Sequence, residues 1–151
     1  MMSDKPNYDV GDDLPGPTRA ITTQRIEWYD SAMLSAATNE LRQVGSNIHT
    51  DEEFARSEGF PAANADGMIM TNWCSEMLIR AFGMDYLERG ELRTKYIKPV
   101  YLGVPLHVRG RIKEATKQPN GSTTYTIDVW CEDGEGTKLV DGDAKVDVAR
   151  D

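Results

Sequence analysis

Apolar residues recur at helical spacing in two stretches of the N-terminal half of the chain. In the first stretch they stand at Ile26, Tyr29, Met33, Leu34 and Ala37. Thr23, just before this stretch, has the hydroxyl side chain of a helix N-cap. The second stretch, residues 68–82, is apolar on nearly every side and stops at Gly83. A helix that is apolar all round is a buried one, so this stretch predicts a central helix in the core.

The periodicity is lost between these two predicted helices. Residues 39–47 show no period and predict a loop. Thr50 followed by Glu53 is a capping-box pattern, which marks the start of a helix. A short helix is therefore expected over residues 51–58, with His49 directly before it.

The C-terminal half changes to the two-residue alternation that is typical of β-strands. Strands are expected over residues 92–101, 104–115, 123–131 and 138–149. Asn120-Gly121 is a strong hairpin signal between two of them. One more short strand is expected over residues 18–22, after an irregular segment, 1–17, that is rich in Asp, Pro and Gly. A buried helix followed by four strands in a meander predicts an α+β domain whose antiparallel sheet is covered on one face.

The size and charge of the chain narrow the classes of function. Its 151 residues are close to the commonest size of a single domain, which we expect over residues 18–151. The net charge is −8, from 25 Asp and Glu against 17 Lys and Arg. This sign repels phosphate backbones and anionic lipid, so we expect no nucleic acid and no membrane as partner. No stretch approaches the ~20 apolar residues that a membrane-spanning helix needs.

The rarer residue types bear on compartment and metal binding. Cys74 and Cys131 lie far apart without metal-binding spacing, so we expect small core or interface residues in a cytoplasmic protein. His49 and His107 are the two histidines of the chain, which is little material for a histidine-built metal site. We therefore expect no metal.

Three segments form a set in this order and at this spacing. The first is residues 47–51 (NIHTD), followed by EEFARSEGF; the second is residues 65–68 (ADGM); the third is residues 95–103 (KYIKPVYLG), followed by LHVRG. Together they resemble the MaoC-like dehydratase family, which includes the R-specific enoyl-CoA hydratases, from about Arg25 to the end of the chain. The resemblance implies a hot-dog fold, in which a curved antiparallel sheet of about five strands wraps one long helix, and a dimer of such domains.

The resemblance also implies a chemistry. Members of the family hydrate or dehydrate acyl thioesters of coenzyme A or acyl carrier protein across a 2,3 double bond, with no cofactor besides the coenzyme A of the substrate. An Asp five positions before a His activates water with it, and a backbone amide at the start of the central helix polarises the thioester carbonyl. On this sequence the His falls on His49 and the amide on Gly67 or Met68. The Asp position holds Val44, and the His-Gly pair common at the helix opening is Asp66-Gly67.

Each candidate residue has a catalytic interpretation and a structural one. A histidine can move a proton in both directions near neutral pH, so His49 is either an acid–base residue or packs beside the helix cap. Asp66 is either an N-cap carboxylate or the missing acid–base partner of His49. Asn47 and Asn64 position water or carbonyl, or simply form turns. Gly67 lets a thioester carbonyl approach the backbone, or serves a tight turn.

Two further groups complete the set of candidates. Asn39 and Glu40 lie near the position of the family Asp and can replace it if their loop folds inward. Five basic residues form a cluster that either meets the phosphates of coenzyme A or belongs to a solvated sheet face, which we favour for the last two: Arg93, Lys95, Lys98, Arg109 and Arg111. Trp73, Cys74 and Met77 are expected in the core or at a dimer interface.

Three functions remain open at this point. The leading hypothesis is a hydro-lyase acting on an enoyl or hydroxyacyl thioester, with His49 and Asp66 as its acid–base pair. The alternatives are a non-catalytic subunit that binds the thioester or a catalytic partner chain, and a hot-dog thioesterase with Asp66 aimed at the carbonyl. In every case the expected ligand is an acyl-CoA or acyl-carrier thioester, and the expected assembly is a homodimer or a multiple of dimers, because pairing protects exposed sheet edges.

Overall fold

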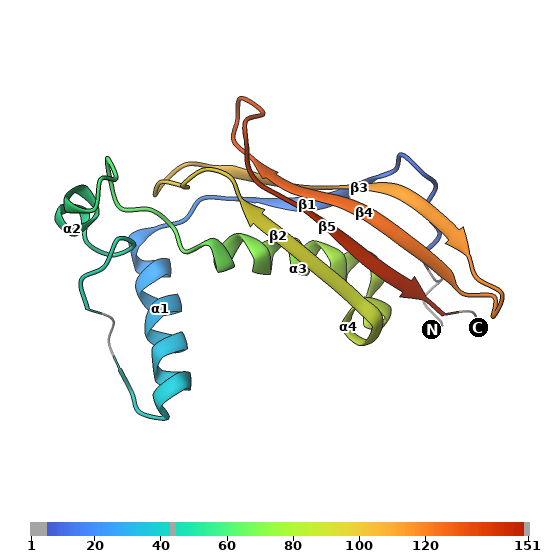
Figure 1. Ribbon diagram of the computed structural model, residues 1–151, viewed down its shortest axis with the longest axis horizontal. Coiled ribbons are helices and arrows are strands. Elements are labelled where there is room, and N and C mark those ends of the chain that lie inside the picture. The colour runs from blue at the N-terminus through green and yellow to red at the C-terminus, as the bar shows by residue number, and fades with distance from the viewer. Residues whose placement is uncertain (1–5, 43–44, 150–151) are drawn as a thin grey trace.

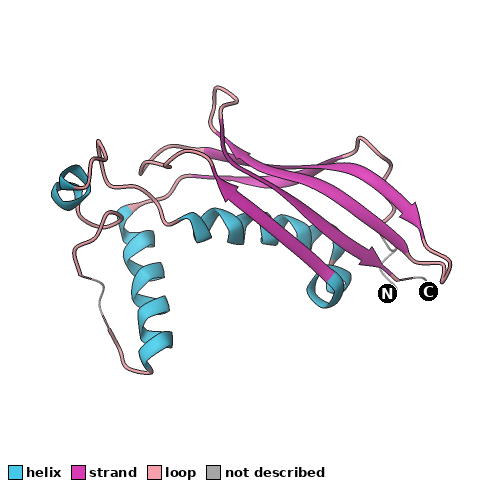
Figure 2. Ribbon diagram, in the orientation of Figure 1, coloured by secondary structure: helices cyan, strands magenta, loops and turns pink. Residues whose placement is uncertain are grey.

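The computed structural model describes residues 6–42 and 45–149, which form one antiparallel sheet with its helices on one side and at one end (Figure 1). The elements in chain order are β1 (Asp13–Arg19), α1 (Thr23–Thr38), α2 (Glu52–Ser57), α3 (Gly67–Phe82), α4 (Met84–Arg89), β2 (Gly90–Tyr96), β3 (Leu106–Lys117), β4 (Thr123–Glu132) and β5 (Lys138–Val148). Helix α3 lies along one face of the sheet, and α1 and α2 lie beyond one end of it (Figure 2). The predicted α+β architecture, a central helix on a curved five-stranded sheet, is confirmed.

The order of the strands differs in one respect from the predicted meander. The order is β1-β3-β4-β5-β2, and all neighbours are antiparallel. Only β3, β4 and β5 form a meander, because β2 pairs with β5 at the far edge. The cause is α4, which the sequence pattern did not predict. It starts directly after Gly83 and runs beside β5, where Arg89 Nε donates to the Asp147 carbonyl at 3.1 Å.

The core lies between α3 and the covered face of the sheet. The buried residues of α3 are Ile69, Met70, Trp73, Cys74, Met77, Leu78 and Phe82. Strand β3 alternates as predicted, with Val108 and Ile112 buried while Arg109 and Arg111 are exposed. Cys74 and Cys131 are free buried thiols whose sulfur atoms are 3.9 Å apart, so their interpretation as core residues is confirmed.

Strand β1 begins earlier than the predicted strand over residues 18–22 and lies partly inside the segment expected to be irregular. Its prolines are accommodated because β1 is an edge strand and its pairing with β3 shifts register between Pro15 and Thr18. Gly16 permits a close approach of the two strands. A Cβ atom at this position would lie 2.2 Å from the carbonyl oxygen of Val108.

The caps of two helices lie one residue away from their predicted positions. The hydroxyl of Thr22, rather than Thr23, accepts from the Arg25 amide at the start of α1. The carboxylate of Asp51, rather than the Thr50 hydroxyl, caps α2 by accepting from the Phe54 amide at 3.0 Å. A carboxylate at this position also interacts favourably with the positive end of the helix dipole.

Helix α1 packs against the core through its first turns. Ile26 is fully buried and Tyr29 packs against the core, whereas Trp28 and Met33 are exposed. The helix extends away from the sheet in Figure 2, so half of its predicted apolar stripe faces solvent. None of the helices in residues 6–42 and 45–149 is long and apolar enough to cross a membrane.

Candidate active site

The turn before α2 fixes the backbone of His49. The side-chain oxygen of Asn47 accepts from the backbone amide of His49 at 2.7 Å and from that of Thr50 at 3.1 Å. An Asn that bonds amides two and three residues onward forms a local turn in place of regular structure. Asn47 is thereby a positioning residue for His49.

One ring nitrogen of His49 is held by a backbone carbonyl. Nδ1 lies 2.8 Å from the carbonyl oxygen of Asn64. A carbonyl oxygen only accepts, so Nδ1 carries the proton in this bond. In the neutral ring Nε2 then holds the free lone pair, and this is the atom that can take a proton from water.

Asn64 is clamped between two distant segments. Its amide donates to the Ile48 carbonyl at 3.1 Å, and it forms an isolated antiparallel bridge with Tyr101. The residue is only 5% exposed. Its side-chain nitrogen is buried and has no hydrogen-bond partner within the described part of the chain. An orphaned buried donor is destabilising by roughly 1–3 kcal/mol, so it indicates a site that a ligand acceptor can complete.

The start of α3 presents one engaged and one open amide. The carboxylate of Asp66 accepts from the Met68 amide at 2.8 Å, which confirms its interpretation as an N-cap. The Met68 amide is therefore occupied, and the Met68 side chain is exposed. The Gly67 amide is at the first position of the helix, where no intrahelical acceptor exists. Of the two amides indicated by the resemblance, Gly67 is the one left to bind a carbonyl.

Gly67 is required for a steric reason that the sequence did not reveal. A Cβ atom at this position would lie 2.6 Å from the ring of Tyr96. The Tyr96 hydroxyl is 2.8 Å from that of Thr71 on α3, so the ring is fastened across the first turn of the helix. The open amide and the ring therefore share one confined space.

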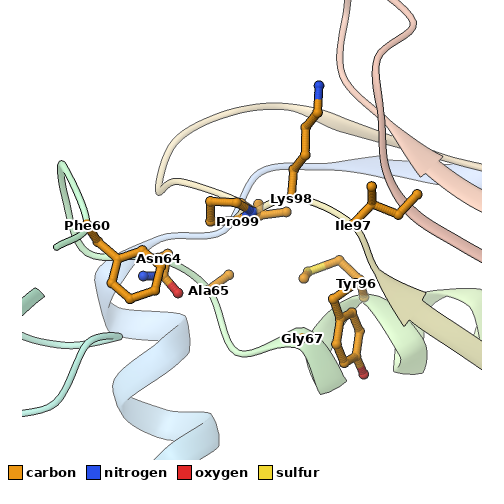
Figure 3. A pocket seen from close by; sticks show the side chains of 10 residues that line it. Phe60, Asn64, Ala65, Gly67, Tyr96, Ile97, Lys98 and Pro99 are labelled. Atoms are coloured by element: carbon orange, nitrogen blue, oxygen red, sulfur yellow. The ribbon is translucent and has the colours of Figure 1, made fainter. Parts of the chain in front are cut away.

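A cavity of about 300 Å³ lies at the start of α3 (Figure 3). Its lining includes Asn64, Gly67, Tyr96, Lys98 and Val100. In Figure 3 the Lys98 side chain extends away from the cavity. His49 is not part of the lining. Asn64 joins the two, because its carbonyl holds the His49 ring and its side chain reaches the cavity.

Asp30 on α1 is a charged neighbour of this site that the sequence pattern did not single out. Burial raises the pKa of the Asp30 carboxyl above its usual value. His49 acts in the opposite direction, the charge of Asp66 adds to the increase in pKa, and a hydrogen bond from Asn47 lowers it again. Asp30, His49, Asp66 and Asn47 are thus close enough to interact. The signal in the sequence was the helical spacing from the buried Ile26 to Asp30, one turn later.

The candidates in the loop after α1 do not reach this cluster. Glu40 is exposed and forms an ion pair with Arg42 at 2.6 Å, and Asn39 ends the helix in a left-handed conformation. Val44, which holds the position of the family Asp, lies outside the described residues.

The arginines of β2 and β3 lie on solvated surfaces, as the sequence predicted for Arg109 and Arg111. Arg109 pairs with Glu132 at 2.9 Å, Arg111 with Asp13 at 2.7 Å, and Arg93 with Asp143 at 3.7 Å. Exposed pairs of this kind contribute only ~0–1 kcal/mol each. In residues 6–42 and 45–149, no group of three or more His, Cys, Asp and Glu side chains is arranged to hold a metal ion.

The architecture defines the class of fold: a long helix on a curved, open five-stranded antiparallel sheet is the hot-dog fold of the MaoC-like dehydratases. No family model matches the sequence, and no curated protein matches it.

Several solved structures are similar to this chain. A MaoC-like dehydratase from Rhodospirillum rubrum is 19% identical, with a TM-score of 0.72 over 95% of this chain and 94% of that chain. The (R)-hydratase from A. caviae involved in PHA biosynthesis is 16% identical, with a TM-score of 0.68 over 94% and 98%. The HadBC (3R-hydroxyacyl-ACP dehydratase) complex from Mycobacterium tuberculosis is 15% identical, with a TM-score of 0.66 over 93% and 98%. The resemblance found in the sequence is thereby confirmed at the level of the fold.

Proposed function

We propose that this protein is a hydratase or dehydratase of acyl thioesters, with His49 as acid–base residue and a carboxylate partner from a position other than 44. The observation that carries the proposal is the double role of Asn64. Its carbonyl orients the His49 ring, and the residue, whose side-chain nitrogen has no partner among the described residues, belongs to the lining of the cavity together with Gly67. Acid–base group and carbonyl-binding donors are thus joined through one residue.

The ligand that fits these groups is an acyl thioester. Its carbonyl oxygen would accept from the Gly67 amide, which has no intrahelical acceptor, and from Asn64 Nδ2, which has no partner among the described residues. Donors aimed at an oxygen on which negative charge develops are the usual means of stabilising a thioester enolate. The electron-poor C3 of an enoyl group is then open to water, and His49 Nε2 is the free ring nitrogen that can take the proton of this water.

The carrier and the acyl chain follow from the surroundings of the cavity. A volume of about 300 Å³ favours a short acyl chain. Lys98 lines the cavity and its side chain extends outward, where its charge can meet the phosphates of coenzyme A or of an acyl carrier. Coenzyme A enters as part of the substrate, and the chemistry needs no further cofactor.

The alternatives receive different support. The carboxylate of Asp66 is engaged by the Met68 amide, which speaks against its use as the attacking or base group of a thioesterase. A non-catalytic subunit is favoured by the exposed apolar residues of α1 and by the heteromeric dehydratase complex among the structures with this fold. It is the second candidate function.

A hydration assay with two histidine variants tests the proposal. Wild type is incubated with short and branched enoyl-CoAs, and loss of the conjugated thioester is followed by absorbance. His49→Ala is expected to lower turnover by ~10²-fold or more, the usual reach of one proton-transfer group. His107→Ala is the matched control, because this ring bonds Thr18 on the sheet, outside the site. A wild type that hydrates no substrate, yet binds acyl-CoA in calorimetry, would transfer support to the non-catalytic subunit.

A further inference from the structure

Helix α1 turns one carboxylate toward the candidate site. Residues three and four positions apart lie on the same face of a helix, and here that face carries the buried Ile26, the core-packed Tyr29 and Asp30. Asp30 is half-buried, whereas Glu27 on the same helix is exposed. The inner face of α1 therefore presents Asp30 to the turn that holds His49.

Asn47 connects Asp30 to His49. Its side-chain oxygen is already committed to the amides of His49 and Thr50. Its side-chain nitrogen is thereby turned the other way, and it donates to the Asp30 carboxylate. A single amide group thus holds the backbone of the histidine with one end and the carboxylate with the other.

We propose that Asp30 is the carboxylate partner of His49, supplied by α1 instead of by position 44. The inference rests on the proposed function, since it assigns a residue to that same reaction. Asp66, the partner expected from the sequence, already serves as the cap of α3 through the Met68 amide. Its place is to hold the helix start, and the proton-carrying role falls to Asp30.

The pair provides what hydration of an enoyl thioester needs. The oxygen of water bonds to C3 while the electrons of the C2–C3 double bond shift toward the thioester carbonyl. One member of the pair takes the proton released by water, and the other gives a proton to C2 as the electrons return. With one proton between the two groups, Asp30 and His49 hold one donor and one acceptor. The product is the 3-hydroxyacyl thioester, and transfer of the proton back between the two groups resets the site.

The raised pKa of Asp30 agrees with this geometry. Burial opposes its ionised form, and the charged groups that face it are His49, which favours that form, and Asp66, which opposes it. Perturbed carboxyls beside a histidine are typical of acid–base sites.

Isosteric variants of the acidic residues test the assignment. Asp30→Asn keeps the shape of the side chain and can still accept from Asn47, but it cannot carry a proton. It is expected to lower kcat for enoyl-CoA hydration by ~10²-fold or more, with melting temperature preserved. Glu27→Gln removes a charge from the exposed face of the same helix and should leave kcat unchanged. Asp66→Asn should change kcat less than Asp30→Asn does.

A second readout does not depend on turnover. Binding of a short acyl-CoA, followed by calorimetry, should be kept in Asp30→Asn as in Glu27→Gln, because neither change removes a donor to the thioester carbonyl. Hydration that survives Asp30→Asn overturns the assignment and leaves the proposed function standing. A wild type without hydratase activity contradicts the proposed function and this assignment alike.

Discussion

At the scale of single residues, Asn64 shows how much of the site is invisible in the sequence. An Asn after Pro and before Gly is typical of a turn, and its role in binding was one of two interpretations. In the structure it is buried, its carbonyl orients His49, and its side-chain nitrogen has no partner within the described residues. These properties depend on contacts with Ile48 and Tyr101, which are remote from Asn64 in the sequence.

Asp30 is expected to make stability depend on pH in the opposite sense to most carboxylates. Its pKa is raised in the folded state, so the folded protein binds this proton more tightly than the unfolded chain does. The resulting stabilisation is fully present below the unfolded pKa, ~3.9, and is lost as pH rises through the folded pKa. At neutral pH the half-buried charge of the Asp30 carboxylate therefore destabilises the folded state.

Asp30→Asn removes this destabilising charge. Its melting temperature at neutral pH should equal or exceed that of wild type, and stability should fall less between acidic and neutral pH. Denaturant unfolding at a series of pH values measures both, with Glu27→Gln as the reference for loss of one charge. A variant that is markedly less stable than wild type at neutral pH would indicate that the Asp30 carboxylate stabilises the fold.

At the scale of elements, the periodicity of apolar residues predicted the type of element and the face that is buried. The alternation of β3 and the all-round apolar character of α3 both appear in the structure as expected. The position of β2 in the sheet did not follow from periodicity. Its pairing with β5 depends on the position at which the chain leaves α4, and α4 lies beside β5. The short α4 was missed because its six residues show no clear period. The early start of β1 was missed because prolines usually argue against a strand.

A substitution in the first turn of α3 tests whether the Tyr96 ring leaves room for a side chain at position 67. Gly67→Ala would place its Cβ 2.6 Å from the Tyr96 ring, so ring and helix start must separate. Because Tyr96 is 46% exposed and its ring can shift, the loss of stability should lie at the low end of the ~1–3 kcal/mol that is typical of core overpacking, and the shift also disturbs the surroundings of the Gly67 amide. We expect a lower melting temperature and weaker binding of acyl-CoA by calorimetry.

The contact with Tyr96 is isolated by a second change. Gly67→Ala combined with Tyr96→Ala should be less destabilised than the sum of the two single variants, as contacting residues show coupling. Gly134→Ala is the matched control, since a Cβ there has no atom within 4 Å. Additive effects in the double variant would mean that the ring does not confine Gly67.

At the scale of the whole molecule, the candidate site is assembled from segments that are remote in sequence. It combines the inner face of α1, the turn at residues 47–50, the strand-like residues 64–66 and the start of α3. The resemblance to a known family covered the turn before α2 and the start of α3, so His49 and Gly67 could be named from it. Asn64 was named separately, as a residue that either positions water or carbonyl or forms a turn. It did not extend to a carboxylate from α1, because that position follows from packing of the helix and not from a motif.

The exposed surfaces of the fold lead to a prediction on assembly. Strands β1 and β2 end the sheet, and α1 leaves Trp28 and Met33 exposed. Open sheet edges and apolar side chains of this kind are normally covered by another chain. We expect a homodimer, or a multiple of dimers, in sedimentation velocity at micromolar concentration, with dissociation on dilution as the control. A monomer across the whole concentration range would contradict this prediction.

The most direct test of the central claim follows the oxygen of water. Wild type is incubated with a short enoyl-CoA in water labelled with heavy oxygen, and the products are analysed by mass spectrometry. A hydratase must place the label in the hydroxyl on C3 of an intact 3-hydroxyacyl-CoA, and His49→Ala must fail to do so. Label in a free carboxylic acid, with release of coenzyme A, would identify a thioesterase instead, and unlabelled starting material would contradict the account of the site as catalytic.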